Sequence, residues 1–225
     1  MTPASARVTR SKTSDEVVDH LLERLFDGRL RSGDRVDIDE VAETLGVSRI
    51  PVREALVVLE RDGIVTTRWH RGVYVEPFDT ETIVDDFEVY GLLSSVAVAR
   101  LAERRDPAVV AELERLLGEL EATAPDDERS IIDLVQQILR VEHRAGGSRR
   151  LRAELRSFDA FLPRVFSVTG GRSHARIVAE QSRVIRAIAA GDADLAARSR
   201  VEDVKAAGED AARELERRGI FRHEP

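Results

Sequence analysis

Two arginines, Arg49 and Arg53, are spaced so that their side chains would share one face of a helix. Residues four apart are neighbours on a helix surface. The planar fork of a guanidinium group can bind guanine O6 and N7, or a phosphate, through two parallel hydrogen bonds. A second basic group, RWHRG at 68–72, lies between two apolar stretches. These residue types therefore indicate recognition of duplex DNA.

The residues around the two arginines predict two short helices joined by a tight turn. A first helix is expected to begin after Asp37, whose carboxylate can accept from the backbone of Glu40 while Glu40 reaches back. Gly46 then ends this helix, because glycine adopts a positive φ at little cost. Ser48 can cap the second helix, and Pro51 lies early enough to remove no needed hydrogen bond. A turn this short makes the helices cross steeply, as in a helix-turn-helix.

The apolar pattern completes a winged helix-turn-helix. Strands are expected over 64–67 and 73–75, joined by the basic segment 68–72 as a wing. The second helix would bury one stripe and leave its arginines outside. Two alternatives stay open: the arginines form an ordinary solvated face, or the winged helix binds only protein. Asp37, Ile38 and Leu45 are interpreted as purely structural. The predicted core of the two helices consists of Ile38, Val41, Leu45, Val52, Ala55, Leu56 and Leu59.

Length and composition predict two domains in a cytoplasmic protein. The chain has 225 residues and divides into a DNA-binding domain, 1–76, and an all-helical domain, 77–225. It has no cysteine, which excludes disulfides and thiolate metal sites. No apolar run is long enough for a signal peptide or a membrane span. Aromatic residues make up only 4%, so a stacking platform for single-stranded nucleic acid is disfavoured.

The charge balance does not by itself indicate a DNA-binding protein. The net charge is −7, and residues 1–76 carry 12 basic against 14 acidic side chains. The positions of the basic side chains matter more than the net charge, because a local positive patch is enough to attract DNA. The basic side chains expected on one side are Arg7, Arg10, Lys12, Arg49, Arg53, Arg68 and Arg71.

After Pro77 the sequence predicts six helices separated by short loops. Loops this short make neighbouring helices antiparallel, so the fold class is mainly α, with an antiparallel helical bundle whose interior can hold a small ligand. The fourth helix would carry Leu151, Leu155, Phe158 and Leu162 on one stripe and kink or end at Pro163. The expected ranges are 80–103, 107–123, 129–144, a helix from Ser148, 173–190, and a last helix from 193 to about 218.

The motifs GVSRIPVREAL, LERDGIV and RGVYV, with VVDHLLERLFDGRL and RSGDRV before them, resemble the GntR family of bacterial transcriptional regulators. The usual threonine after Ser-Arg is Ile50 here, which removes a hydroxyl often used for a phosphate contact. The resemblance implies base and phosphate contacts from the second helix, backbone contacts near Arg35, and minor-groove contacts from the wing. The implied DNA-binding residues are Arg35, Ser48, Arg49, Ile50, Arg53, His70, Arg71 and Gly72.

The second half resembles the FadR-type, or FCD, effector domain of that family, most clearly in EQSRVIRAIAAGD at 180–192. Such domains hold a divalent metal with an Asp and three His. The corresponding residues here are Asp133, Gln137, Gln181 and Asp203. Because an amide oxygen is a far weaker ligand than imidazole for zinc or nickel, these residues do not predict a tight site for a divalent metal, and the sequence indicates no particular cofactor. Two histidines of this half, His143 and His174, are expected to be partly exposed near helix ends.

The first bundle helix also departs from the family, which commonly has Arg and Glu where this chain has Tyr90 and Ser94. An effector pocket is expected to be lined by Tyr90, Ser94, Asp133, Gln137, Arg140, Gln181 and Asp203. Polar residues aimed inward cost free energy unless they find partners, which favours a ligand or trapped water there. The alternative is that they hydrogen-bond one another.

The resemblance implies a homodimeric regulator, not an enzyme, that binds a short palindromic operator and responds to an unidentified small molecule. Such regulators are more often repressors. Two other readings remain open. One is a constitutive DNA-binding protein with a degenerate pocket. The other is a metal-dependent helical-bundle enzyme with Asp133 and Asp203 as ligands.

Overall fold

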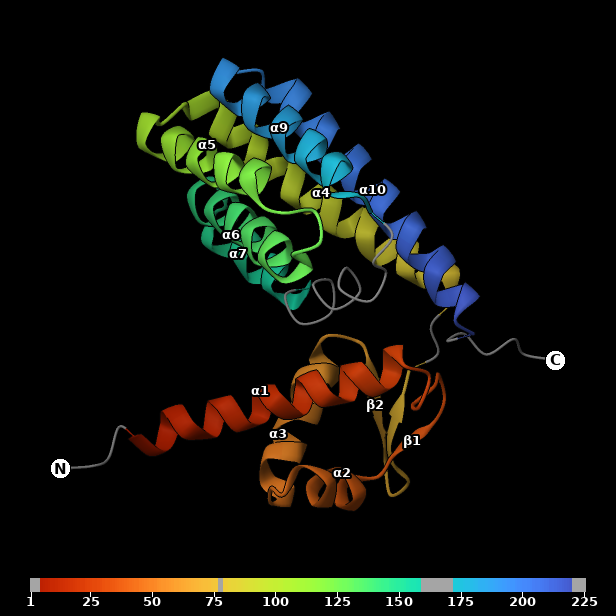
Figure 1. Ribbon diagram of the computed structural model, residues 1–225. Coiled ribbons are helices and arrows are strands. Elements are labelled where there is room, and N and C mark those ends of the chain that lie inside the picture. Colours follow the sequence, from red (N-terminus) through yellow and green to blue (C-terminus); the bar gives the residue numbers. More distant parts are fainter. Residues whose placement is uncertain (1–4, 77–78, 159–171, 220–225) are drawn as a thin grey trace. The chain divides into compact units, whose positions relative to one another are not determined.

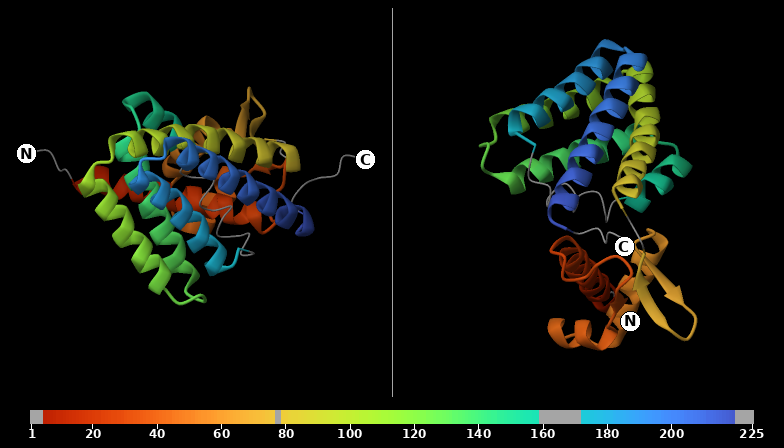
Figure 2. Two further views of the ribbon diagram at one scale, coloured as in Figure 1. Left: turned by 90° about the horizontal axis from the view of Figure 1, so that it is seen from above. Right: turned by 90° about the vertical axis from the view of Figure 1, so that its right-hand side faces the viewer.

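The computed structural model of the chain describes residues 5–76, 79–158 and 172–219, and these form two compact units (Figures 1 and 2). The winged-helix unit comprises the residues up to Asp79 together with those from Leu215 onward, and the helical unit runs from Thr80 to Glu214. The expected fold class, a winged helix-turn-helix followed by an all-helical domain, is confirmed.

The winged-helix unit contains three helices and a small antiparallel sheet with strand order β1-β3-β2. Strand β1 pairs with β3 through Arg35 and Tyr74, and β2 pairs with β3 from Val65 opposite Val75 to Arg68 opposite Gly72. The sequence did not predict β1, because a two-residue strand is too short to show a period. The elements are α1 (Ser5–Phe26), β1 (Arg35–Val36), α2 (Ile38–Leu45), α3 (Arg49–Arg61), β2 (Val65–Arg68) and β3 (Gly72–Val75).

The predicted ends of α2 are confirmed, apart from one cap contact. The Asp37 carboxylate accepts from the backbone N–H of Glu40 at 3.2 Å. Glu40 does not reach back to Asp37 but forms an ion pair with Arg24 at 2.9 Å, so the expected reciprocal capping is wrong. Gly46 ends the helix in the left-handed region with φ 63°, as predicted.

Helices α1 and α3 form the core of the winged-helix unit. The predicted stripe of α3 is buried, while in the predicted stripe of α2 Val41 is buried and Ile38 and Leu45 are half-buried. This packing fixes the orientation of α3 and leaves its opposite face in solvent. The main buried side chains are Val17, Leu21, Leu22 and Leu25 on α1 and Val52, Ala55, Leu56 and Leu59 on α3.

The helical unit matches the predicted succession of helices within the described residues. The Asp106 carboxylate caps α5 through the N–H of Ala108, and Pro107 occupies the first turn. The end of the predicted fourth helix, with Leu162 and Pro163, lies outside the described residues. None of the described helices has the length and apolar character needed to cross a membrane. The elements are α4 (Thr80–Arg104), α5 (Pro107–Ala122), α6 (Glu128–Gly146), α7 (Arg149–Leu155) with a 3-10 turn (Arg156–Phe158), α9 (His174–Ala190) and α10 (Ala193–Arg217).

Helix α4 is central to the helical unit, and glycines allow two helices to approach it closely. A Cβ on Gly146 of α6 would lie 2.1 Å from the carbonyl oxygen of Ala97. A Cβ on Gly208 of α10 would lie 2.5 Å from Cβ of Phe87. Helix α4 also packs against α9, and α5 covers α6 and α9 (Figure 2). These contacts bring side chains of α4, α6 and α10 together in the interior.

Candidate nucleic-acid interface and buried polar cluster

The exposed face of α3 carries both predicted arginines. Arg49, Ile50 and Arg53 are all exposed, and the side chain of Ile50 is 52% exposed. Ser48 occupies the N-cap position but makes no side-chain cap hydrogen bond, so the predicted cap contact is not formed. The first backbone N–H groups of the helix are then available to a phosphate.

The two arginines differ in their partners. The Arg49 guanidinium binds the Asp39 carboxylate of α2 through two contacts, Nε–Oδ1 at 2.5 Å and Nη2–Oδ2 at 3.0 Å. Arg53 has no carboxylate within ion-pair distance in the described part of the chain. Because an exposed ion pair contributes only about 0–1 kcal/mol, Arg49 can exchange Asp39 for another partner at little cost. The guanidinium group of Arg53 is therefore available to a ligand, and that of Arg49 is oriented by Asp39.

Tyr74 on β3 contacts several residues of the wing. The Arg68 guanidinium carbon lies 4.5 Å from the centre of the Tyr74 ring. Arg35 lies opposite Tyr74 in the sheet, and its Nε would be 2.9 Å from a Cβ on Gly72. Gly72 has φ 106°, a backbone conformation that favours glycine. The Arg35 side chain lies against the wing at this glycine.

The tip of the wing is a tight turn with an aromatic side chain. The N–H of Arg71 donates to the carbonyl of Arg68 at 2.9 Å, and the hydroxyl of Tyr74 donates to the carbonyl of Arg71 at 3.2 Å. His70 adopts a positive φ of 56°. Trp69 is 85% exposed, and the sequence analysis did not include it among the site residues.

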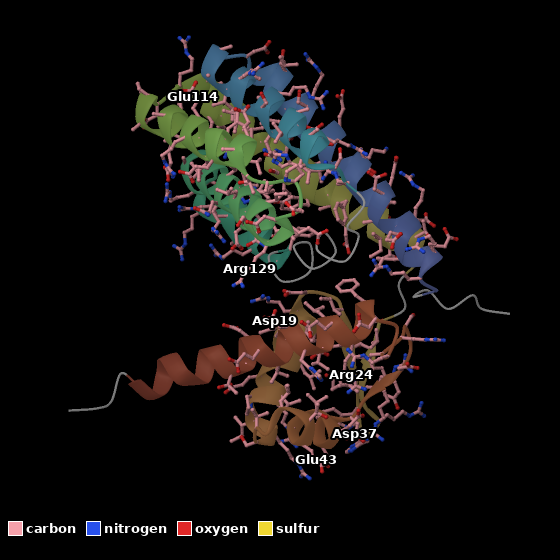
Figure 3. The ribbon with its side chains drawn as sticks, viewed as in Figure 1. Asp19, Arg24, Asp37, Glu43, Glu114 and Arg129 are labelled. Carbon is pink, nitrogen blue, oxygen red and sulfur yellow. The ribbon has the colours of Figure 1, made fainter. Side chains whose placement is uncertain are left out.

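The start of α3 and the tip of the wing lie at the same end of the winged-helix unit (Figure 1). Carboxylates are also present there, including Asp37 and Glu43 around α2 (Figure 3). Because the unit is not basic as a whole, its attraction for DNA depends on the exposed guanidinium groups of α3 and the wing. The side chains of the leading arm, Arg7, Arg10 and Lys12, lie outside the described residues.

The interior of the helical unit contains a buried ion pair. Nη2 of Arg200 on α10 lies 2.7 Å and 2.6 Å from the two carboxylate oxygens of Glu142 on α6, and both side chains are buried. Burial raises the pKa of the Glu142 carboxyl, and the charge and hydrogen bonds of Arg200 oppose that rise. This pair was not predicted from the sequence, although Glu142 lies four residues after Ile138 on the apolar stripe.

His143 lies beside this pair and contacts α4. Its Nε2 lies 3.1 Å from the Ser94 hydroxyl, and its ring meets the ring of Tyr90 edge-on with centres 5.8 Å apart. Burial, assisted by the charge of Arg200, lowers the pKa of His143 to about 4. The imidazole is therefore neutral at pH 7 and can donate or accept a hydrogen bond. The expectation that His143 is merely a partly exposed residue misses these contacts.

The proposed pocket residues do not all come together. Tyr90, Ser94, Gln181 and Asp203 are buried, and Oε1 of Gln181 has no hydrogen-bond partner among the described residues. The prediction that three polar residues of α6 line a pocket is wrong, because they lie off the buried face that Ile131, Leu134 and Ile138 define. The residues of α6 that were predicted to line the pocket but are exposed are Asp133, Gln137 and Arg140.

The residues at the family metal positions do not fit a metal. Asp133 and Gln137 are exposed on α6, whereas Gln181 is buried on α9. Asp203 on α10 is paired with Arg183. Nowhere in the described ranges do three His, Cys, Asp or Glu side chains gather as metal ligands. His174 has a structural contact instead, with its Nε2 2.7 Å from the carbonyl oxygen of Leu120.

The winged helix-turn-helix joined to an all-helical unit defines a class of DNA-binding regulatory proteins. The profile of bacterial regulatory proteins of the gntR family matches residues 13–75, and that of the FCD domain matches residues 85–205. The chain therefore belongs to the GntR family, among its members with an FCD domain.

Individual relatives agree with this assignment. An uncharacterized HTH-type transcriptional regulator of Mycobacterium tuberculosis is 42% identical over 158 residues, which are 70% of this chain and 64% of that protein. The chain thus spans about two thirds of the length of this relative. A probable D-xylose utilization operon transcriptional repressor of Paenarthrobacter nicotinovorans is 33% identical over 45% of either chain. The solved structure of E. coli McbR/YncC has the same fold, with a TM-score of 0.63 at 22% identity over 86% of this chain and 94% of that one.

Proposed function

We propose that this protein is a regulator of transcription that binds a specific duplex operator. The N-terminal half of α3 enters the major groove, and the wing meets the flanking minor groove. One observation carries this proposal. The exposed guanidinium group of Arg53 lies near that of Arg49, which Asp39 orients, and the start of α3 lies at the same end of the unit as the basic tip of the wing. A major groove admits one helix, and paired arginines suit guanine edges there.

The other predicted residues take supporting roles in this arrangement. Ile50 is exposed and apolar, which suits contact with a thymine methyl group. Ser48 and the first N–H groups of α3 suit a phosphate. Arg35 and Arg71 suit phosphates beside the wing, while His70 and Gly72 shape the turn that approaches the groove.

A second copy of the chain is the proposed partner of the helical unit. Val89, Leu92 and Val96 are exposed at helical spacing on α4, which forms an apolar stripe on an otherwise polar surface. Pairing of this stripe about a two-fold axis would place two winged-helix units on a palindromic operator.

The helical unit is proposed to sense a small molecule by means of its buried polar cluster. Tyr90 and Ser94 contact His143, which follows Glu142 of the Glu142–Arg200 pair, and Gln181 is buried on α9. Oε1 of Gln181 has no hydrogen-bond partner among the described residues, and because a buried polar group costs free energy unless it is satisfied, a polar ligand has a role there. A ligand acts only if it binds the DNA-competent and incompetent states with different affinity. By analogy with the Paenarthrobacter repressor, the proposed sign of regulation is repression.

The test of DNA binding is selection of duplexes from a random pool by the full chain. Arg53→Ala should weaken binding to the selected duplex by about 1–3 kcal/mol, with relaxed preference at one position. The matched control is Arg150→Ala, which removes an exposed arginine of α7 that pairs only with Glu154 among the described residues. Selection of no duplex, or equal losses in the two variants, would contradict the proposal.

Sensing has a separate test that also decides between the two other readings. The melting temperature of the full chain is measured against a metabolite library, and a compound that raises it should also change affinity for the selected duplex. If no compound does so, the constitutive DNA-binding protein is favoured. Metal-dependent hydrolysis by the wild-type chain that Asp203→Asn abolishes would support the enzyme instead.

A further inference from the structure

Trp69 is the most exposed large apolar side chain among the described residues, at 85%, and it is the only tryptophan of the chain. Burying a tryptophan removes about 150–250 Å² of surface from water. An isolated exposed apolar residue carries no meaning by itself. Its surroundings therefore decide whether this indole has a partner.

The turn that carries Trp69 is stiff. The turn hydrogen bond between Arg71 and Arg68, and the bond from Tyr74 to Arg71, hold the backbone on both sides of it. The Trp69 ring meets the ring of His70 edge-on, with centres 5.0 Å apart. The backbone that carries the indole is thus held in place, which lowers the part of the binding entropy that ordering of the turn would cost.

The wing is also tied to α3. The backbone N–H and the hydroxyl of Thr67 on β2 donate to the two carboxylate oxygens of Glu60 on α3, at 2.7 Å and 3.0 Å. The position of the wing relative to the arginine face of α3 is therefore fixed within the unit. A duplex bound to α3 would meet Trp69 at a defined base step.

The positive charges beside the indole indicate which kind of partner Trp69 can bind. Arg68 and Arg71 flank Trp69, and neither forms an ion pair with a carboxylate in the described residues. A partner must then combine negative charge with flat apolar faces, as the phosphates and stacked bases of DNA do. Apolar wedges are known to enter a minor groove and partly unstack a base step.

We propose that Trp69 is such a wedge, which enters the minor groove and partly unstacks one base step of the operator. This inference rests on the proposed DNA binding. Because pyrimidine–purine steps unstack most easily, Trp69 would give the protein a preference for TA or CA/TG at that step without hydrogen bonds to the bases. The wing would thus add specificity to that of α3.

The test uses the natural fluorescence of the full chain, since all tryptophan emission comes from Trp69. Binding of the selected duplex should shift the emission to the blue and protect it from acrylamide. A 2-aminopurine placed at the wing step should brighten as the step unstacks. Unchanged emission of both fluorophores on a duplex that binds tightly would overturn the proposal and leave the DNA-binding function intact.

Three variants separate stacking from charge. Trp69→Ala should lose about 10- to 100-fold in affinity for the selected duplex, and Trp69→Phe should lose much less. Trp69→Lys adds a positive charge and should still bind as poorly as Trp69→Ala. The wedge would be overturned if Trp69→Lys bound the selected duplex more tightly than Trp69→Ala. It would also be overturned if the single strand changed the Trp69 emission as much as the duplex does. Failure of the wild type to select any duplex would instead refute the proposed function itself.

Discussion

At the residue scale, Arg49, which is proposed to face DNA, is paired with the neighbouring Asp39 in the free protein. Asp39 lies on α2 and places a negative charge beside the proposed interface. It can therefore act in two ways, by aiming the Arg49 fork and by repelling phosphates. Both effects reduce binding to the wrong sequence, since the Arg49 guanidinium is oriented for a partner that offers two acceptors, and Asp39 repels the phosphates of any duplex.

Asp39→Asn separates these effects. The variant should bind unrelated duplexes about 3- to 10-fold more tightly and should discriminate less between the selected duplex and a mismatched one, because Arg49 is no longer aimed. Affinities are measured for both duplexes over a range of salt concentrations. The control is Glu43→Gln, which removes an exposed carboxylate of the same helix that holds no arginine among the described residues. Identical behaviour of the two variants would mean that Asp39 acts by charge alone.

His143 predicts a pH dependence of stability. Its pKa falls from the ordinary 6.5 to about 4 in the folded chain, chiefly through burial. Above pH 6.5 neither the folded nor the unfolded state is protonated at this group. Between pH 6.5 and about pH 4, His143 is protonated in the unfolded state but stays neutral in the folded state. The free energy of unfolding should therefore fall over this window, by on the order of 3 kcal/mol in total.

The measurement is urea unfolding of the full chain by circular dichroism at several pH values in this window. His143→Gln keeps a hydrogen-bonding group near Ser94 but cannot take up the proton. The free energy of unfolding of the wild type minus that of the variant should therefore decrease as the pH falls. A constant difference across the window would show that His143 does not control the acid sensitivity.

At the element scale, two glycines inside helices are predicted to respond to alanine in opposite directions. Gly146→Ala would drive a Cβ into the backbone of α4, 2.1 Å from the Ala97 oxygen, and should cost about 1–3 kcal/mol. Gly118→Ala on α5 meets nothing within 4 Å and should stabilise the chain by about 1 kcal/mol. Thermal and urea unfolding of both variants checks this. Stabilisation by Gly146→Ala would mean that α4 and α6 do not approach as closely as described.

The sequence predicts the helices well because their ends carry local signals. Asp37, Gly46, Asp106 and Gly191 each satisfy or end a helix through contacts within a few residues. Strand β1 has no such signal, because its pairing with β3 depends on a contact far along the chain. Local chemistry is readable from sequence, whereas contacts between distant elements are not.

The same contrast separates the two predicted sites. On α3 the apolar stripe defines the exposed face, so the exposure of Arg49, Ile50 and Arg53 could be predicted. On α6 the polar residues were assigned from a family pattern rather than from the stripe, and the result was a wrong face for Gln137. The Glu142–Arg200 pair breaks the apolar stripes of two helices, and only their packing shows that the charges meet.

At the scale of the whole molecule, we expect operator recognition to depend on the proposed dimer. Two half-sites bound at once give an affinity that one winged-helix unit cannot reach, because the second contact becomes intramolecular. The stripe of Val89, Leu92 and Val96 on α4 is the proposed contact between copies. Its disruption should leave each winged-helix unit folded and able to bind a half-site weakly.

Leu92→Glu tests this by placing a charge in the middle of the stripe, where the side chain is 52% exposed in the single chain. Sedimentation should show a dimer for the wild type and a monomer for the variant, and affinity for the palindrome should fall at least about 100-fold with little change for a half-site. The control is Leu195→Glu, since Leu195 is an exposed leucine of α10 outside the stripe. A variant that remains dimeric with unchanged affinity would place the contact elsewhere, and a wild-type chain that stays monomeric on a palindrome would refute the two-fold arrangement.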